Sequence, residues 1–220
     1  MSEKFNEELV WKQKFSNDLA KFRKEAYNLD NIMPKRYCLV LTNLCNLACD
    51  FCYQIRTKQK TSMSASEWIE LIKDLPKNSR VTLTGGEPLV FKNFKEIFLE
   101  TTKLHECNLI CNGLLLTEEI IDLLLSQKNF KVLSISIDNR KNTIRKSANV
   151  NEKKWDEKWA HAEKMMLYFQ KRKFELGHPT CVLDSKTVVL DENAKDLLDI
   201  HKYCVEDLQC DTHSFQFLKG

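Results

Sequence analysis

The segment Arg36-Tyr-Cys-Leu-Val-Leu-Thr-Asn-Leu-Cys-Asn-Leu-Ala-Cys-Asp-Phe-Cys52 joins a short apolar run to three closely spaced cysteines. The run from Tyr37 to Leu41 is typical of a buried strand, so Cys45, Cys49 and Cys52 fall in the loop directly after it. A cubane iron–sulfur cluster takes four thiolates, and three cysteines without a nearby fourth would leave one iron open to an outside ligand. A structural zinc site is the second interpretation, and it needs a fourth ligand from a distant cysteine or histidine.

The composition suits one globular domain with a substantial core, because the 220 residues are 43% hydrophobic and 30% charged. The 34 basic and 31 acidic residues are dispersed, so charge points to neither nucleic acid nor a membrane surface. We find no signal peptide and no apolar run of membrane-spanning length, and we expect a cytoplasmic protein. In a reducing compartment, nine cysteines favour metal binding or burial over disulfides. Six cysteines outside the loop are expected to be structural: Cys38, Cys107, Cys111, Cys181, Cys204 and Cys210.

The apolar pattern predicts an N-terminal helical extension over residues 1–36 and one core domain over residues 37–220. Apolar residues recur at helical spacing from Phe5 to Ala26, which predicts an amphipathic helix, and Pro34 interrupts the pattern. Strands and helices then alternate. Strands are expected at 37–41, 81–84, 108–111, 132–137, 185–190 and 214–218, and helices at 68–75, 94–104, 117–126, 151–174 and 194–208. This order predicts an α/β fold with a parallel sheet, either flat or closed into an incomplete barrel.

The carboxyl ends of parallel strands carry the working loops of such folds. Gly85, Gly86 and Gly113 come just after expected strands, which suggests a ligand close to the backbone there, although βα turns also use glycine for their own geometry. Glu87 and Pro88 follow the glycine pair, so a carboxylate also stands at a strand end. It could hold an ammonium group or lie in a solvated turn.

Taken in order, these motifs resemble the radical S-adenosylmethionine (SAM) superfamily. The matching stretches are Cys45-x-x-x-Cys49-x-x-Cys52 with Tyr53, Thr84-Gly-Gly-Glu-Pro88, Cys111-Asn-Gly113 and Ser134-Ile-Ser-Ile-Asp138. The resemblance covers residues 37–219. It is nearest to the cores of enzymes with a C-terminal SPASM or twitch extension, because Ile144-Arg145 and a long helix follow Asp138.

Two features depart from the family pattern. Asn139-Arg140 stand where the family often has glycine, which leaves the geometry of that turn in doubt. No cysteine-rich extension follows the sixth expected strand in this sequence, so we expect no ligands for an auxiliary cluster.

The resemblance implies a partial (β/α)6 TIM-like barrel in which Cys45, Cys49 and Cys52 bind three irons of a [4Fe-4S] cluster. SAM would chelate the fourth iron through its amino and carboxylate groups. The implied SAM or substrate contacts are Gly85, Gly86 and Glu87 to the ammonium, Ser136 and Arg145 to the carboxylate, Asn112 and Asp138 to the ribose or substrate, and Tyr53 with the last strand near Phe217 to the adenine.

The residues themselves also allow plainer interpretations of these positions. Ser136 could be a small inward-facing residue, Asp138 a turn cap and Arg145 a surface residue. Core positions are expected for three aromatic residues, namely Trp155, Phe215 and Phe217.

The activity implied by the resemblance begins with reduction of the cluster by a flavodoxin- or ferredoxin-like donor. SAM would then be cleaved to a 5′-deoxyadenosyl radical that abstracts a hydrogen atom from a peptide, sugar or small-metabolite substrate. A glycyl-radical-enzyme activase is an alternative, and so is a non-catalytic module that binds zinc or an iron–sulfur cluster. The glycine and carboxylate features at separate strand ends count against the non-catalytic module.

Overall fold

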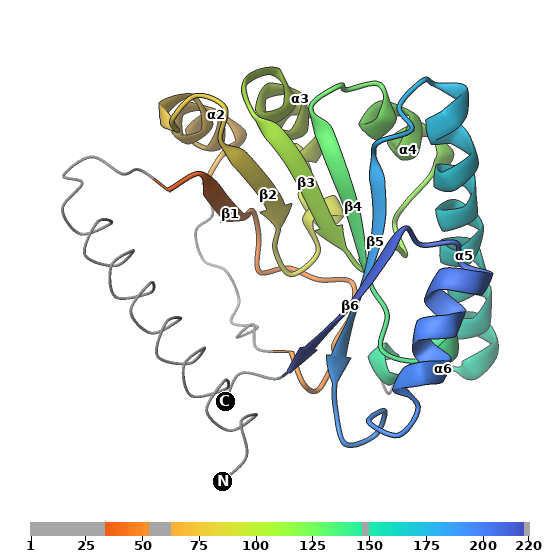
Figure 1. Ribbon diagram of the computed structural model, residues 1–220. Coiled ribbons are helices and arrows are strands. Elements are labelled where there is room, and N and C mark those ends of the chain that lie inside the picture. The colour runs from red at the N-terminus through yellow and green to blue at the C-terminus, as the bar shows by residue number, and fades with distance from the viewer. Residues whose placement is uncertain (1–33, 53–62, 147–149, 218–220) are drawn as a thin grey trace, which may run out of the picture. The chain divides into compact units, whose positions relative to one another are not determined.

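The computed structural model describes residues 34–52, 63–146 and 150–217 (Figure 1). The chain divides into two units, Met1–Pro34 and Lys35–Gly220, and the description below concerns the second. The helix expected between Phe5 and Ala26 and the expected cofactor residue Tyr53 lie outside the described residues. Within the described ranges, no helix is both long enough and apolar enough to cross a membrane.

Six parallel strands form one open sheet in the order β1-β2-β3-β4-β5-β6 (Figure 1). Each strand is hydrogen-bonded to the next one along the chain, so every connection crosses over in a βα unit. The strands are β1 Arg36–Val40, β2 Arg80–Thr84, β3 Glu106–Cys111, β4 Phe130–Ser136, β5 Val182–Val189 and β6 Thr212–Phe217. This confirms the expected α/β architecture of a partial TIM-like barrel.

The helices lie along one face of the sheet (Figure 1). They are α2 Ala65–Asp74, α3 Phe94–Leu104, α4 Glu118–Leu125, α5 Glu152–Glu175 and α6 Leu197–Lys202. A capping box starts α2, because the Ser64 hydroxyl accepts from the Glu67 N–H and the Glu67 carboxylate accepts from the Ser64 N–H at 2.6 Å. The helix expected over 194–208 is shorter, since α6 passes into a wider turn, η3 Tyr203–Asp207. Two further short turns are η1 Pro88–Val90 and η2 Arg140–Arg145.

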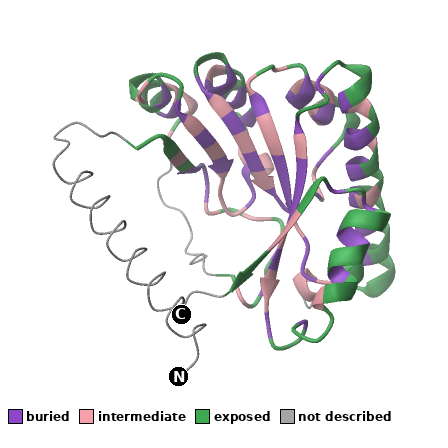
Figure 2. Ribbon diagram, viewed as in Figure 1, coloured by how far each residue is buried: buried purple, intermediate pink, exposed green. Residues whose placement is uncertain are grey.

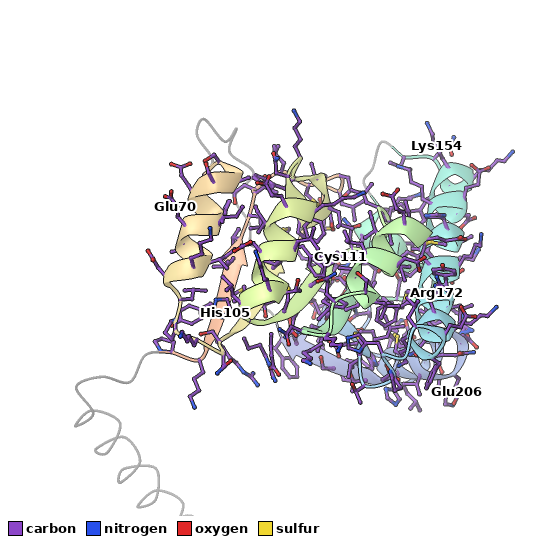
Figure 3. All side chains as sticks on the ribbon, turned by 90° about the horizontal axis from the view of Figure 1, so that it is seen from above. Glu70, His105, Cys111, Lys154, Arg172 and Glu206 are labelled. Carbon is purple, nitrogen blue, oxygen red and sulfur yellow. The ribbon has the colours of Figure 1, made fainter. Side chains whose placement is uncertain are left out.

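Strand alternation separates the two faces of the sheet. Leu39, Leu83 and Leu109 pack in the core with Ile97 and Phe98 of α3 and are almost fully buried. Buried and less buried segments alternate along the central strands (Figure 2). Charged side chains such as those of Glu70, Lys154 and Glu206 lie on the outside of the molecule (Figure 3). The inner face of the barrel is therefore left to smaller and polar residues.

The expected core positions of the aromatic residues hold only in part. Trp155 is 1% exposed and belongs to the core, as predicted. Phe215 and Phe217 are 40% and 79% exposed, so their core prediction was wrong. Both belong to β6, an edge strand of the open sheet, where there is less surrounding structure to cover a side chain.

Candidate active site

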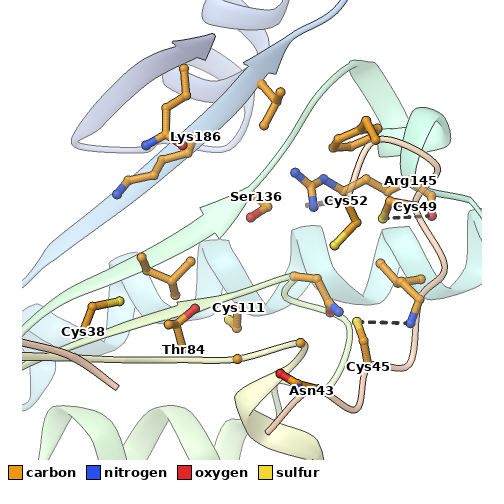
Figure 4. Close-up of a pocket in the computed structure, with 18 residues that line it drawn as sticks. Cys38, Asn43, Cys45, Cys49, Cys52, Thr84, Cys111, Ser136, Arg145 and Lys186 are labelled. Atoms are coloured by element: carbon orange, nitrogen blue, oxygen red, sulfur yellow. Dashed lines mark hydrogen bonds between the residues drawn. The ribbon is translucent and has the colours of Figure 1, made fainter. Parts of the chain in front are cut away.

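A cavity of about 260 Å³ opens at the carboxyl ends of the strands (Figure 4). Its walls come from all six strands and from the cysteine loop. The lining residues that bear chemistry are Cys38, Asn43, Cys45, Cys49, Cys52, Thr84, Gly85, Gly86, Cys111, Asn112, Ser136, Arg145, Lys186 and Gln216. The structure thus brings together most of the residues selected from the sequence.

The two glycines after β2 hold the start of the cysteine loop. The Gly86 N–H donates to the Thr42 carbonyl at 2.6 Å, and the Glu87 N–H donates to the Leu44 carbonyl at 2.8 Å. A Cβ atom on Gly85 would lie 2.7 Å from the Thr42 oxygen. These glycines therefore serve close backbone packing against the loop as well as lining the cavity.

The three motif cysteines all face this cavity. Cys49 is buried with Leu47 and Trp155 in a small apolar cluster, which fixes the loop on the first turns of α5. Burial raises the pKa of the Cys45 thiol, and the negative charges of Glu87 and the neighbouring thiolates raise it further. Metal binding requires the thiolate, so a bound metal cation would have to supply the stabilisation that burial removes.

The spacing of these thiols bears on which metal group fits. Among the described residues, no three His, Cys, Asp or Glu side chains lie close enough to hold a single metal ion. Each thiolate of a cubane cluster binds a different iron, so its ligands are spread around a group larger than one ion. The chemistry of the donors fits such a cluster, because Cys45, Cys49 and Cys52 bring three thiols to the wall of one cavity.

Glu87 lies beside the cavity but is not part of its wall. Its side chain is 1% exposed, and its two oxygens accept from the backbone N–H groups of Leu89 at 3.2 Å and Asn112 at 2.8 Å. Burial raises the pKa of Glu87 to about 7, although these two hydrogen bonds oppose the shift. The carboxylate therefore joins the turn after β2 to the end of β3, and the backbone of Gly85 and Gly86 faces the cavity instead.

Asn112 both lines the cavity and ties β3 to the cysteine loop. Its Nδ2 donates to Asn46 Oδ1 at 2.7 Å, and its Oδ1 accepts from the Leu114 N–H at 3.0 Å. The next residue, Gly113, has a φ of +82°, a conformation that glycine adopts without strain. Asn112 thus has a positioning role that the sequence did not indicate.

Ser136 and Arg145 line the cavity, whereas Asp138 lies behind them. Asp138 is fully buried, and its carboxylate lies 2.5 Å from Arg145 Nε and accepts from the Val188 N–H at 2.7 Å. Burial raises the pKa of Asp138, and the charge of Arg145 partly offsets this. The guanidinium also lies over the Phe51 ring, with 5.3 Å from Cζ to the ring centroid. Asp138 therefore orients Arg145 from outside the cavity.

The turn after β4 answers the question raised by Asn139-Arg140. The left-handed conformation occurs further on, at Lys141 and Asn142, with φ of 62° and 51°. Asn142 is buried; its Oδ1 accepts from the Asp138 N–H and its Nδ2 donates to the Ser136 carbonyl, both at 2.9 Å. The sequence analysis missed Asn142, and its signal was that asparagine tolerates this conformation and caps its own turn.

Two other expectations change. Five of the six cysteines expected to be structural are buried, but Cys38 is exposed and lines the cavity. Alternation places it on the inner face because Leu39 beside it faces the helices. Lys186 and Gln216 also line the cavity and were not selected from the sequence, whereas Phe217, which was, is not among the lining residues.

Comparisons with known proteins agree with this geometry. A family model described as the Radical SAM superfamily matches residues 39–204. The chain is 38% identical over 120 residues to the sporulation killing factor maturation protein SkfB of Bacillus subtilis, an alignment covering 53% of this chain and 29% of SkfB. It is 34% identical over 105 residues to a GTP 3′,8-cyclase of Synechocystis, covering 44% of this chain and 32% of the cyclase.

Among solved structures, Streptococcus suis SuiB bound to S-adenosylmethionine superposes with a TM-score of 0.68 at 17% identity. That match covers 100% of this chain and 48% of SuiB. SuiB bound to its precursor peptide SuiA gives a TM-score of 0.67 at 17% identity, covering 94% of this chain and 44% of SuiB. At such identity these likenesses show the fold alone. The chain spans about a third of the curated relatives and about half of the solved structures.

Proposed function

The chain belongs to the radical SAM superfamily, which uses a [4Fe-4S] cluster and SAM, and from this premise we propose that it is a peptide-modifying enzyme. The observation that carries the proposal is a cavity whose wall includes Cys45, Cys49 and Cys52 together with Gly85, Gly86, Ser136 and Arg145. When bound, the cluster and SAM supply a 5′-deoxyadenosyl radical that takes a hydrogen atom from the substrate. The residues of the chain hold and orient the reactants.

We assign the cluster to the three motif cysteines. For SAM, the backbone of Gly85 and Gly86 is a suitable partner for an ammonium group, because both glycines line the cavity and have no side chain that would keep a ligand away from their peptide groups. Arg145 and the Ser136 hydroxyl are donors suited to a carboxylate. Tyr53, which follows the last motif cysteine, keeps its proposed place at the adenine.

Three residues of the motifs act indirectly in this proposal, by positioning other residues of the site. Asp138 fixes the guanidinium of Arg145, while Glu87 and Asn112 hold the loops that carry the glycines and cysteines. We still propose that Asn112, which lines the cavity, contacts the ribose of SAM or the substrate. For the buried Asp138 we favour the positioning role over the direct contact first expected.

Peptide is the favoured substrate class because of two relatives. SkfB is named as a maturation protein for a killing factor, and SuiB has been solved with a precursor peptide. The likeness to GTP 3′,8-cyclases makes a nucleotide the second candidate. A flavodoxin- or ferredoxin-like protein is the proposed electron donor. Activation of a glycyl-radical enzyme is the alternative to peptide modification as the function of this chain.

Anaerobic reconstitution with iron and sulfide, followed by reduction with dithionite and excess SAM, tests this function. We expect about four irons per chain and release of methionine and 5′-deoxyadenosine. Cys49→Ala should lose bound iron and product formation together. Cys38→Ser, in the same cavity but outside the motif, should keep its iron content. One equivalent of zinc with no iron uptake would contradict the proposal.

The substrate class needs a separate experiment. Short peptides encoded beside the gene, deuterated at carbon, should transfer deuterium into 5′-deoxyadenosine. Transfer from GTP but from no peptide would favour the nucleotide alternative.

A further inference from the structure

One end of the cavity is not used by the cluster and SAM contacts assigned above. Cys38 of β1, Lys186 and Val188 of β5 and Gln216 of β6 line this end, and we call these four residues the Lys186 subsite. Figure 4 shows Cys38 and Lys186 on one side of the cavity and Cys49, Cys52 and Arg145 on the other. The subsite thus lies beside the proposed SAM site, where a substrate would meet the radical.

The positive charge of Lys186 has only a weak ion-pair partner among the described residues. Its Nζ lies 3.9 Å from Asp184 Oδ2, its one ion-pair partner among the described residues. Asp184 already accepts shorter hydrogen bonds from Ser134 Oγ at 2.6 Å and Thr212 Oγ1 at 2.7 Å. An ammonium has three donors, so Lys186 can still donate to a ligand in the cavity.

The charge of Lys186 acts inside the cavity. Burial raises the pKa of the Cys38 thiol, and the positive charge of Lys186 partly offsets that shift. The two residues belong to strands at opposite sides of the open sheet, so this electrostatic effect crosses the barrel interior. An anion bound there would meet the same charge.

We propose that the Lys186 subsite binds a carboxylate of the substrate, with Lys186 as its charged partner and the Gln216 amide as a second donor. A singly charged anion fits better than a phosphate, because Asp184 beside Lys186 would repel a dianion and the subsite has only one cation. This inference rests on the proposed function and narrows the class of peptide substrate. The peptide would present an acidic side chain or its carboxyl terminus next to the reacting C–H bond.

Cys38 is a built-in reporter for the proposal, because it is exposed to the cavity and lies outside the cluster motif. Iodoacetate and iodoacetamide both alkylate a thiolate, forming a C–S bond and releasing iodide, but only iodoacetate carries a carboxylate. The ratio of their rates at Cys38, read by peptide mass spectrometry on cluster-loaded protein, cancels any change in the thiolate fraction. Attraction by one nearby cation should favour iodoacetate on the order of fivefold.

The matched variants are Lys186→Gln and, as a control, Lys195→Gln at an exposed position outside the cavity. Lys186→Gln should lower the iodoacetate to iodoacetamide ratio about fivefold, while Lys195→Gln should leave it unchanged. Arg145 is present in every variant, so its contribution cancels. An unchanged ratio in Lys186→Gln would overturn the inference.

SAM cleavage without substrate supplies the second readout. In Lys186→Gln, 5′-deoxyadenosine should form with the wild-type KM for SAM, because Lys186 is assigned to the substrate. A KM for SAM raised tenfold would show that Lys186 binds SAM and would overturn the inference. If no variant cleaves SAM, the proposed function fails, and the alkylation ratio still reports whether the subsite attracts carboxylates.

Discussion

The cysteine loop and the turn after β4 border the same cavity but are held by different means. The start of the loop is fixed by backbone contacts, in which Gly86 and Glu87 donate N–H bonds to the carbonyls of Thr42 and Leu44. The turn is fixed by buried side chains, above all Asp138 and Asn142. The difference teaches that a motif residue can act through the absence of a side chain in one place and through a buried charge in another.

The largest expected effect comes from breaking the charged anchor of the turn. Asp138→Asn would leave Arg145 without its 2.5 Å partner in a site where Asp138 is fully buried and the Arg145 side chain is 13% exposed. We expect unfolding free energy to fall by about 4 kcal/mol, as for a broken buried ion pair. Urea denaturation measures this, and the KM for SAM should rise because Arg145 is no longer oriented.

Asp156→Asn is the matched control, because it removes a 3.5 Å ion pair to Lys141 in which both side chains are at least half exposed. It should cost less than about 0.5 kcal/mol. Equal losses in the two variants would mean that Asp138 does not anchor the turn.

The backbone-held loop should be broken by adding a single methyl group. In Gly86→Ala, the new Cβ would overlap the Leu44 carbonyl oxygen and lie 2.8 Å from the Asn43 carbonyl oxygen, and the loop must shift to relieve these contacts. We expect a loss of about 3 kcal/mol together with a lower iron content after reconstitution, because the cysteines move with the loop.

Gly177→Ala separates backbone strain from this clash. Gly177 has a positive φ, of +70°, but no atom lies within 4 Å of the position that the added methyl group would take. We expect a loss of about 1 kcal/mol and normal iron content. Reduced iron in both variants would attribute the effect of Gly86→Ala to general instability.

Much of the fold and part of the site could be predicted from local sequence patterns. Hydrophobic periodicity predicted the order of the strands, and α3 begins and ends at the expected residues, Phe94 and Leu104. The cavity-lining positions of Cys45, Cys49, Cys52 and Arg145 followed from motifs at strand ends.

Several features that the sequence did not reveal depend on contacts between distant segments. The bond from Asn112 to Asn46 spans 66 positions, and the neighbourhood of Cys38 and Lys186 depends on how far the sheet curls. The exposure of Phe217 depends on β6 being an edge strand, which its own apolar pattern does not reveal. Local patterns specify the strands and helices, whereas these features depend on which distant segments the folded sheet brings together.

Glu87 joins the turn after β2 to the end of β3, and its titration gives the smallest of the three main effects, after those of Asp138→Asn and Gly86→Ala. Its folded-state pKa of about 7 lies above the ordinary value of 4.5 because the carboxyl is buried. Between these values the native state keeps a proton that the unfolded state has released, so the unfolding free energy must fall as pH rises from about 4.5 to 7. The expected loss is between about 2 and 3 kcal/mol.

Glu87→Gln removes this titration while keeping the size of the side chain and one oxygen to accept from a backbone N–H. Between pH 4.5 and pH 8, the unfolding free energy of the metal-free wild type should therefore fall by about 2 to 3 kcal/mol relative to that of the variant. The other titrating groups are common to both proteins and cancel. Parallel pH profiles would show that the Glu87 carboxyl ionises at its ordinary pKa. In that case the backbone N–H groups of Leu89 and Asn112 stabilise the carboxylate enough to offset its burial.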